Sequence, residues 1–265
     1  MNKLVPVRVG LGLIVVAGLV GACGSNLPQA AAVAASPAPV TAEPVAVATA
    51  PVASAAAPTA GPVTDVLTGG RYLFRPIADV PSLTIEATGP NGWTGYPSWA
   101  MDGPEPVRAD APAGIGIAFF SANGLYRDPC HWDVRGTGGA ATPGDVVVGP
   151  TVDDLVAALR ANTFYTSSDE TPVTIDGYAG KALELQLPDD SFTTCDKDDP
   201  DDPGGHAFVF SGPGLYAQGP ANRWHLSILD VRGTRLIAAI LSYEGTPKVD
   251  LDLAREVVDT LDINP

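Results

Sequence analysis

Short stretches in which hydrophobic and polar residues alternate begin after residue 69, and they predict β-strands. Residues 83–87, Leu-Thr-Ile-Glu-Ala, alternate like a strand buried on one face and end at the Gly-Pro-Asn-Gly turn of residues 89–92. Residues 115–120, Ile-Gly-Ile-Ala-Phe-Phe, predict a second and more buried strand. The run 236–241, Leu-Ile-Ala-Ala-Ile-Leu, is apolar on both faces, which is typical of a central strand.

Two further pairs of alternating segments are separated by short turns and therefore predict β-hairpins. In the first, residues 173–175 lead through Asp176-Gly177 into residues 183–187, whose leucines share a face. In the second, Trp, Leu and Ile recur at alternate positions of residues 224–228 before a turn near Arg232-Gly233. Each hairpin joins its strands antiparallel.

Two segments, near residues 152–159 and 250–260, show the apolar spacing of amphipathic helices. Thr151 can cap the first helix, with Asp154 at the capping-box position. The expected apolar faces comprise Val152, Leu155, Val156 and Leu159 in the first helix, and Leu253, Val257 and Leu261 in the second. Because strands and helices do not alternate strictly, we predict an α+β fold, an antiparallel sheet packed on a few helices after a disordered N-terminal arm.

The first residues of the chain have the order of a bacterial export signal. Lys3 and Arg8 form a basic start, an uncharged and mostly apolar stretch follows, and Val20-Gly21-Ala22 precedes Cys23. The apolar stretch is shorter than the roughly 20 residues of a spanning helix. A thiol directly after small residues resembles the lipobox of bacterial lipoproteins, which implies a signal peptide over 1–22 and lipidation of Cys23. The alternative is a plainly secreted or uncleaved, membrane-anchored protein.

Residues 23–64 consist almost entirely of Ala, Pro, Val, Ser and Thr, with Glu43 as the one charged residue. Recurrent prolines prevent a helix, and the absence of aromatic residues leaves too little apolar surface to offset the entropy of ordering. We therefore predict a disordered tether with a reach on the order of 100 Å. Residues 65–265 then form a single α+β globular domain.

Acidic residues outnumber basic ones, 30 to 15, which gives a net charge of −15. Such a surface repels phosphate backbones and anionic headgroups, so we expect no nucleic-acid partner. Contact with the membrane is expected only through the lipid on Cys23, which would hold the domain on the outer face of the cell membrane.

Cys130 and Cys195 are the two remaining cysteines of the three once Cys23 is lipidated. Outside the cell an even pair in one domain favours a disulfide, and no Cys-x-x-Cys motif supports the alternative of a redox or nucleophilic thiol. We therefore predict a bond between Cys130 and Cys195. Cys130 and the adjacent His131 form no catalytic dyad if they lie on a strand, where neighbours point to opposite faces.

Candidate metal and ligand residues are few. None of the three histidines, His131, His206 and His225, stands at a metal-ligand spacing with another, so no metal site is assigned. The acidic run of residues 196–202 could offer oxygen ligands to Ca²⁺, but it lacks the EF-hand pattern, and a solvated loop is the favoured interpretation. Trp93, Trp99, Trp132 and Trp224 are expected in the core, although they could line a sugar or lipid pocket.

Several ordered strings in the second half resemble an uncharacterised extracytoplasmic lipoprotein domain of high-GC Gram-positive bacteria. The strings are Pro129-Cys130-His131-Trp132, the segment 152–159, the segment 174–181, Cys195 and the segment 229–236. The resemblance spans residues 72–263 and implies an outline similar to the PsbP/Mog1-like α+β fold, without a reaction or ligand.

The chain contains no Gly-x-Ser-x-Gly, Ser-x-x-Lys, His-Glu-x-x-His or phosphate-loop motif. No catalytic residue and no cofactor is therefore assigned. The favoured function is a membrane-anchored extracytoplasmic lipoprotein with a non-catalytic binding or interaction domain. The alternative is a cell-surface hydrolase whose catalytic residues are scattered along the chain.

Overall fold

The structure, a computed structural model, describes most of the chain after residue 65. The described residues are 66–96, 98–105, 113–133, 144–190, 192–197, 205–212, 214–217 and 219–265. The predicted signal peptide, Cys23 and the predicted tether lie outside these ranges, as do residues 198–204 of the acidic region.

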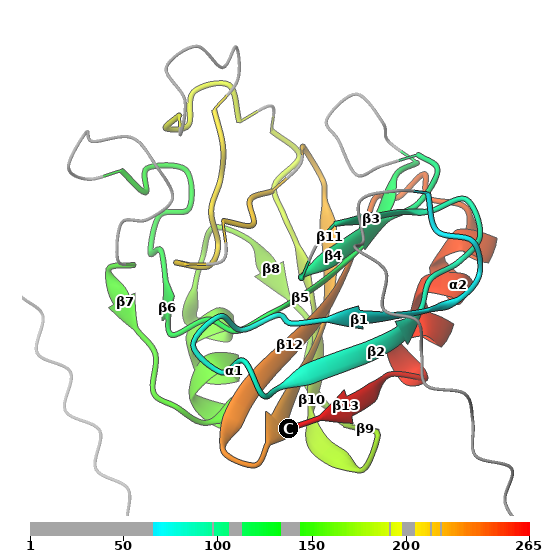
Figure 1. The fold of residues 1–265 in the computed structure, drawn as a ribbon. Helices are drawn as coiled ribbons and strands as arrows, with labels where there is room; N and C mark the ends of the chain where they lie inside the picture. Colours follow the sequence, from blue (N-terminus) through cyan, green and yellow to red (C-terminus); the bar gives the residue numbers. More distant parts are fainter. Residues whose placement is uncertain are drawn as a thin grey trace, which may run out of the picture. The chain divides into compact units, whose positions relative to one another are not determined.

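An antiparallel sheet of eight strands forms the centre of the fold (Figure 1). Its path runs through β3 (Thr94–Tyr96), β4 (Ala100–Asp102), β5 (Ile115–Phe120), β12 (Thr234–Ser242), β11 (Arg223–Val231), β10 (Tyr178–Gln186) and β8 (Thr166–Ser167), and β9 (Thr171–Ile175) also pairs with β10. The predicted central strand is confirmed, because β12 pairs with β5 on one side and β11 on the other.

Two smaller sheets and two helices complete the described part. The smaller sheets are β1 (Arg71–Phe74) with β2 (Thr84–Thr88) and β13 (Asp262–Asn264), and β6 (Gly124–Leu125) with β7 (Val146–Val147). The helices are α1 (Val152–Ala161) and α2 (Lys248–Asp259). The described residues thus form a sheet-rich α+β fold with antiparallel pairing throughout.

Both faces of the large sheet are covered, which explains the continuous apolar run of β12. Ile237, Ala239 and Leu241 enter the hydrophobic cluster that includes the buried side of α1. Leu236, Ala238 and Ile240 enter the opposite cluster, with the small β1–β2–β13 sheet and α2. Successive side chains of a strand point to opposite faces, so a strand between two cores is apolar at every position.

Both predicted hairpins are confirmed, and their turns have the required backbone. Asp176 and Gly177, between β9 and β10, have φ of 48° and 77°. Arg232 and Gly233, between β11 and β12, have φ of 54° and 86°. Two consecutive positive φ angles match the twist of the flanking strands, which is why a Gly stands second in each turn.

The first helix agrees with its prediction and the second agrees in part. At α1 the Thr151 hydroxyl accepts from the Asp154 backbone N–H at 3.1 Å, and the Asp154 carboxylate accepts from the Thr151 N–H at 3.0 Å. Helix α2 begins before residue 250 and ends at residue 259, so the expectation that Leu261 belongs to it is wrong. Its buried residues are Ala254, Val257 and Val258. A strict four-residue spacing drifts around a helix of 3.6 residues per turn, so it does not track one buried face.

Candidate functional site

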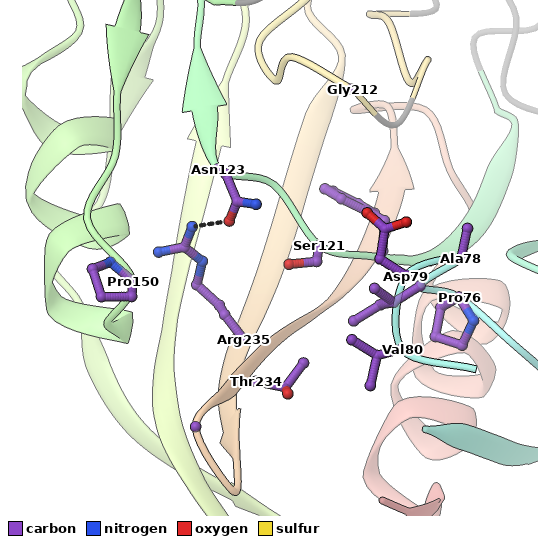
Figure 2. Close-up of a pocket in the computed structure, with 13 residues that line it drawn as sticks. Pro76, Ala78, Asp79, Val80, Ser121, Asn123, Pro150, Gly212, Thr234 and Arg235 are labelled. Atoms are coloured by element: carbon purple, nitrogen blue, oxygen red, sulfur yellow. Dashed lines mark hydrogen bonds between the residues drawn. The ribbon is translucent and has the colours of Figure 1, made fainter. Parts of the chain in front are cut away.

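A cavity of about 470 Å³ opens beside the β11–β12 turn. Its walls come from the segment after β1, the connection between β5 and β6, the residue before the α1 cap, and the start of β12 (Figure 2). The volume lies within the range of small-molecule sites. Its lining residues include Ile77, Asp79, Ser121, Asn123 and Arg235.

Arg235 forms one wall of this cavity and is only 4% exposed. Its Nη1 donates to the backbone oxygens of Gly149 and Thr151 at 2.7 and 2.8 Å. Its Nη2 donates to the backbone oxygen of Ala122 and to Oδ1 of Asn123, the latter at 3.4 Å. One side chain therefore ties the β5–β6 connection and the entry to α1 onto the large sheet.

The electrostatic setting of Arg235 is unusual for a buried cation. Burial lowers the pKa of its guanidinium, and the charge of Asp154 opposes that shift. The oxygen atoms that accept its hydrogen bonds are all uncharged, and its Nε is buried without a hydrogen-bond partner. Buried charges are usually paired with an opposite charge, whereas no carboxylate of the described residues hydrogen-bonds to this guanidinium.

The remaining walls combine apolar surface with a few polar groups. Ile77, Val80 and Phe120 supply apolar surface, and the exposed Asp79 lies across the cavity from Arg235 (Figure 2). The hydroxyl of Ser121 lies between these two charged groups. The lining is thus mixed, with polar groups at least as prominent as apolar side chains, and can hold both a polar and an apolar part of a ligand.

A second hollow of about 420 Å³ continues the first along residues 76–78 and reaches Trp99. Trp99 also lines a recess of about 260 Å³, together with Tyr96, Asp102 and Tyr216. Burial raises the pKa of the Asp102 carboxyl, while a hydrogen bond with the Tyr96 side chain opposes the rise. The cavity at Arg235 is thus part of a longer series of adjoining hollows.

The expectation that all four tryptophans lie in the core is wrong for one of them. Trp93, Trp132 and Trp224 are buried, with 1% of their surface or less exposed. Trp99 is 36% exposed and lies in the connection between the edge strand β3 and its neighbour β4. A side chain near the edge of a sheet is covered by fewer neighbouring residues than one in the middle. The hydrophobic periodicity of a strand does not indicate whether that strand lies at the edge.

A disulfide joins Cys130 to Cys195, with Cα atoms 4.5 Å apart. The backbone N–H of Asp196 donates to the oxygen of Cys130 at 2.8 Å and the Asp196 carboxylate accepts from the N–H of Asp133 at 2.7 Å. Cys130 and His131 lie in a bend that follows Asp128 and not on a strand, so the opposite-face argument of strands does not apply to them. The disulfide therefore links two loops that lie outside the named strands.

The three histidines lie in different settings. His131 pairs with Asp128 at 2.9 Å, and this hydrogen bond raises the pKa of His131. His206 stacks on Tyr216 with ring centroids 3.9 Å apart, whereas His225 is half-buried on β11, where burial lowers its pKa. Within the described ranges, no three His, Cys, Asp or Glu side chains gather as metal ligands. No helix in the described part is long and apolar enough to cross a membrane.

Sequence reasoning did not find the residues that line the cavity. Asp79, Ser121 and Asn123 occupy loops without a motif, and only the fold brings them to Arg235. One signal was present in the sequence: Arg235 stands at the head of an otherwise apolar central strand. Charged side chains are rarely buried unless they have partners, so an arginine in a strand predicted to be buried indicates a specific structural or binding role.

The chain matches no protein-family model and no curated protein. Among solved structures it is similar to LpqN, a protein described as involved in cell envelope biogenesis of Mycobacterium tuberculosis. The match has a TM-score of 0.30 and 13% sequence identity, and covers 77% of this chain and 90% of that chain. This score is below the level of a shared fold, so function is inferred from the residues of this chain alone.

Proposed function

We propose that this chain is a lipoprotein on the outer face of the cell membrane, whose domain binds a ligand without transforming it. The anchor would be a lipid on Cys23, exposed by removal of residues 1–22. Residues 23–64 would act as a tether and residues 65–265 as the binding domain. The order of basic, apolar and small residues before Cys23 supports the anchor.

The observation that carries the binding role is the cavity at Arg235. It has the volume of a ligand site and combines apolar walls with a buried cation. A hydrolase of the serine type would need a base beside its nucleophile. A hydrolase of the carboxylate type would need a pair of acidic side chains. Ser121 lines the cavity, but its described lining includes no histidine and a single carboxylate, Asp79, so it holds neither a Ser–His contact nor paired carboxylates. Binding therefore accounts for this site better than hydrolysis does.

The anchor is tested by changing Cys23→Ala in the full-length chain and separating membrane from soluble fractions. We expect the wild-type protein in the membrane fraction with a covalent lipid label, and the variant released without the label. An uncleaved variant that stays in the membrane would contradict the proposal, because residues 1–22 would then be the anchor.

The binding role is tested by blocking the cavity at its exposed rim. Ala78→Trp places a large side chain in the opening, whereas Ala179→Trp makes the same change at an exposed position of β10 outside the cavity lining. Native mass spectrometry of the three proteins, purified from membranes, would report any bound molecule. We expect the wild type and Ala179→Trp to carry the same added mass and Ala78→Trp to lack it. Identical spectra for all three proteins would contradict the proposal.

A further inference from the structure

We infer that the Arg235 end of the cavity binds an oxyanion of the ligand, either a carboxylate or a phosphate group. This inference rests on the proposed binding function and specifies the chemistry of the ligand. The remaining surface of the cavity, formed by apolar side chains such as Ile77 and Val80, would take the uncharged part of the same molecule.

The first reason is the uncompensated charge of Arg235. The guanidinium is withdrawn from water, and its four hydrogen bonds go to three backbone oxygens and one amide oxygen. Withdrawing a cation from water is costly unless an anion pairs with it. The charge of Asp154 acts on Arg235 but offsets only part of the effect of burial, and its carboxylate makes its hydrogen bonds to Thr151 and not to the guanidinium. An oxyanion in the cavity would supply the missing counter-charge.

The second reason is the set of hydrogen-bond donors at this end. The Nε–H of Arg235 is buried and has no partner. Asn123 directs its Oδ1 to the guanidinium, which leaves its amide nitrogen on the side of the cavity where Ser121 lies (Figure 2). Ser121 contributes a hydroxyl to the same space. Because the Nη hydrogens of Arg235 already go to protein oxygens and its Nε is out of reach of the open cavity, the guanidinium contributes its charge and not a free donor. The amide of Asn123 and the hydroxyl of Ser121 are the donors that match the acceptor oxygens of a carboxylate or phosphate.

The third reason is the position of α1. Pro150, which lines the cavity, directly precedes the cap residue Thr151 of that helix. The amino end of a helix carries a partial positive charge, here reduced by Asp153 and Asp154 in the first turn. It adds to the field of Arg235 and does not create the site by itself.

Asp79 on the opposite wall makes it possible to distinguish anion binding at Arg235 from a purely structural role of that arginine. Its exposed carboxylate would repel an anion bound at Arg235. Removing that charge with Asp79→Asn should tighten anion binding, and the gain should shrink as salt is added. An Arg235 that only holds loops together would give no response of this kind.

The test is an NMR titration of the full mature chain, residues 23–265, carrying Cys23→Ser so that it stays in solution. The signal to follow is the Nε–H group of Arg235, which burial protects from exchange with water. The probes are sodium phosphate and sodium acetate, each compared with sodium chloride at equal ionic strength. We expect a saturable shift of the Arg235 Nε–H signal with phosphate, acetate or both, and the better probe identifies which oxyanion the site prefers.

Three variants sharpen the result without altering the buried arginine. Asp79→Asn should lower the apparent Kd, whereas Asp259→Asn, the same charge change on an exposed residue of α2, should leave it unchanged. Ser121→Ala should raise the Kd by about tenfold, the value of one hydrogen bond to a charged group.

A titration in which neither phosphate nor acetate moves the Arg235 signal beyond the chloride control would overturn the inference. Equal effects of Asp79→Asn and Asp259→Asn would also overturn it, because they would indicate a response to net charge alone. If the titration fails while Ala78→Trp still removes a bound molecule, the binding function stands and only the oxyanion is wrong. If Ala78→Trp removes nothing while phosphate or acetate binds with the expected variant pattern, the anion site stands and the larger ligand is wrong.

Discussion

Removing the disulfide with Cys130→Ala and Cys195→Ala together should destabilise the folded domain substantially. The two cysteines are 65 positions apart, and in the chain-entropy model closing a loop of that length contributes about 4 kcal/mol. For a domain of this size each kcal/mol changes Tm by roughly 2–4 °C. The double variant should therefore melt about 10 °C below the wild type.

The assay is thermal unfolding followed by circular dichroism, with and without a thiol reductant. Reductant should bring the wild type close to the double variant and should leave the double variant unchanged. A thiol assay on the denatured, non-reduced mature protein should find neither Cys130 nor Cys195 free. Two free sulfhydryl groups in that assay would refute the bond, and a Tm change below about 2 °C would refute the magnitude.

The remaining predictions concern the cap of α1, the carboxyl group of Asp102 and the acidic run. Thr151→Ala should lower the free energy of unfolding by about 1 kcal/mol in urea, with Thr151→Ser close to the wild type; equal losses in both variants would contradict the capping role. Because burial raises the pKa of Asp102, the contribution of this side chain to stability should fall as pH rises above 3.8, the ordinary value, through the raised pKa. Asp102→Asn should lose that decline, so its stability relative to the wild type should grow with pH across this window in urea titrations; a constant difference would show the shift to be absent. Chelators or millimolar Ca²⁺ should leave Tm unchanged if residues 196–202 form a solvated loop, and a rise of several degrees with Ca²⁺ would identify a calcium site.

Local patterns were sufficient for the elements whose determinants lie close together in the chain. The hairpin turns at Asp176-Gly177 and Arg232-Gly233 follow from residues that tolerate positive φ. The capping box of Thr151 and Asp154 follows from a three-residue spacing. Even the central position of β12 was predictable, because an unbroken apolar run such as residues 236–241 is typical of a strand covered on both faces.

The candidate site was not predictable, because its residues come from loops that are distant in the sequence. Nothing near Arg235 in the chain indicates that its side chain would reach the oxygens of Ala122 and Gly149 or would face Asp79. Likewise, Trp99 resembles the other tryptophans in the sequence, and its exposure depends on which strands lie at the sheet edge. The sequence by itself determined the longer strands, the two hairpin turns and the capped helix α1, because periodicity and turn chemistry act over a few residues. The tertiary structure alone decided where a buried charge meets a cavity, because that depends on packing between segments separated by more than eighty residues.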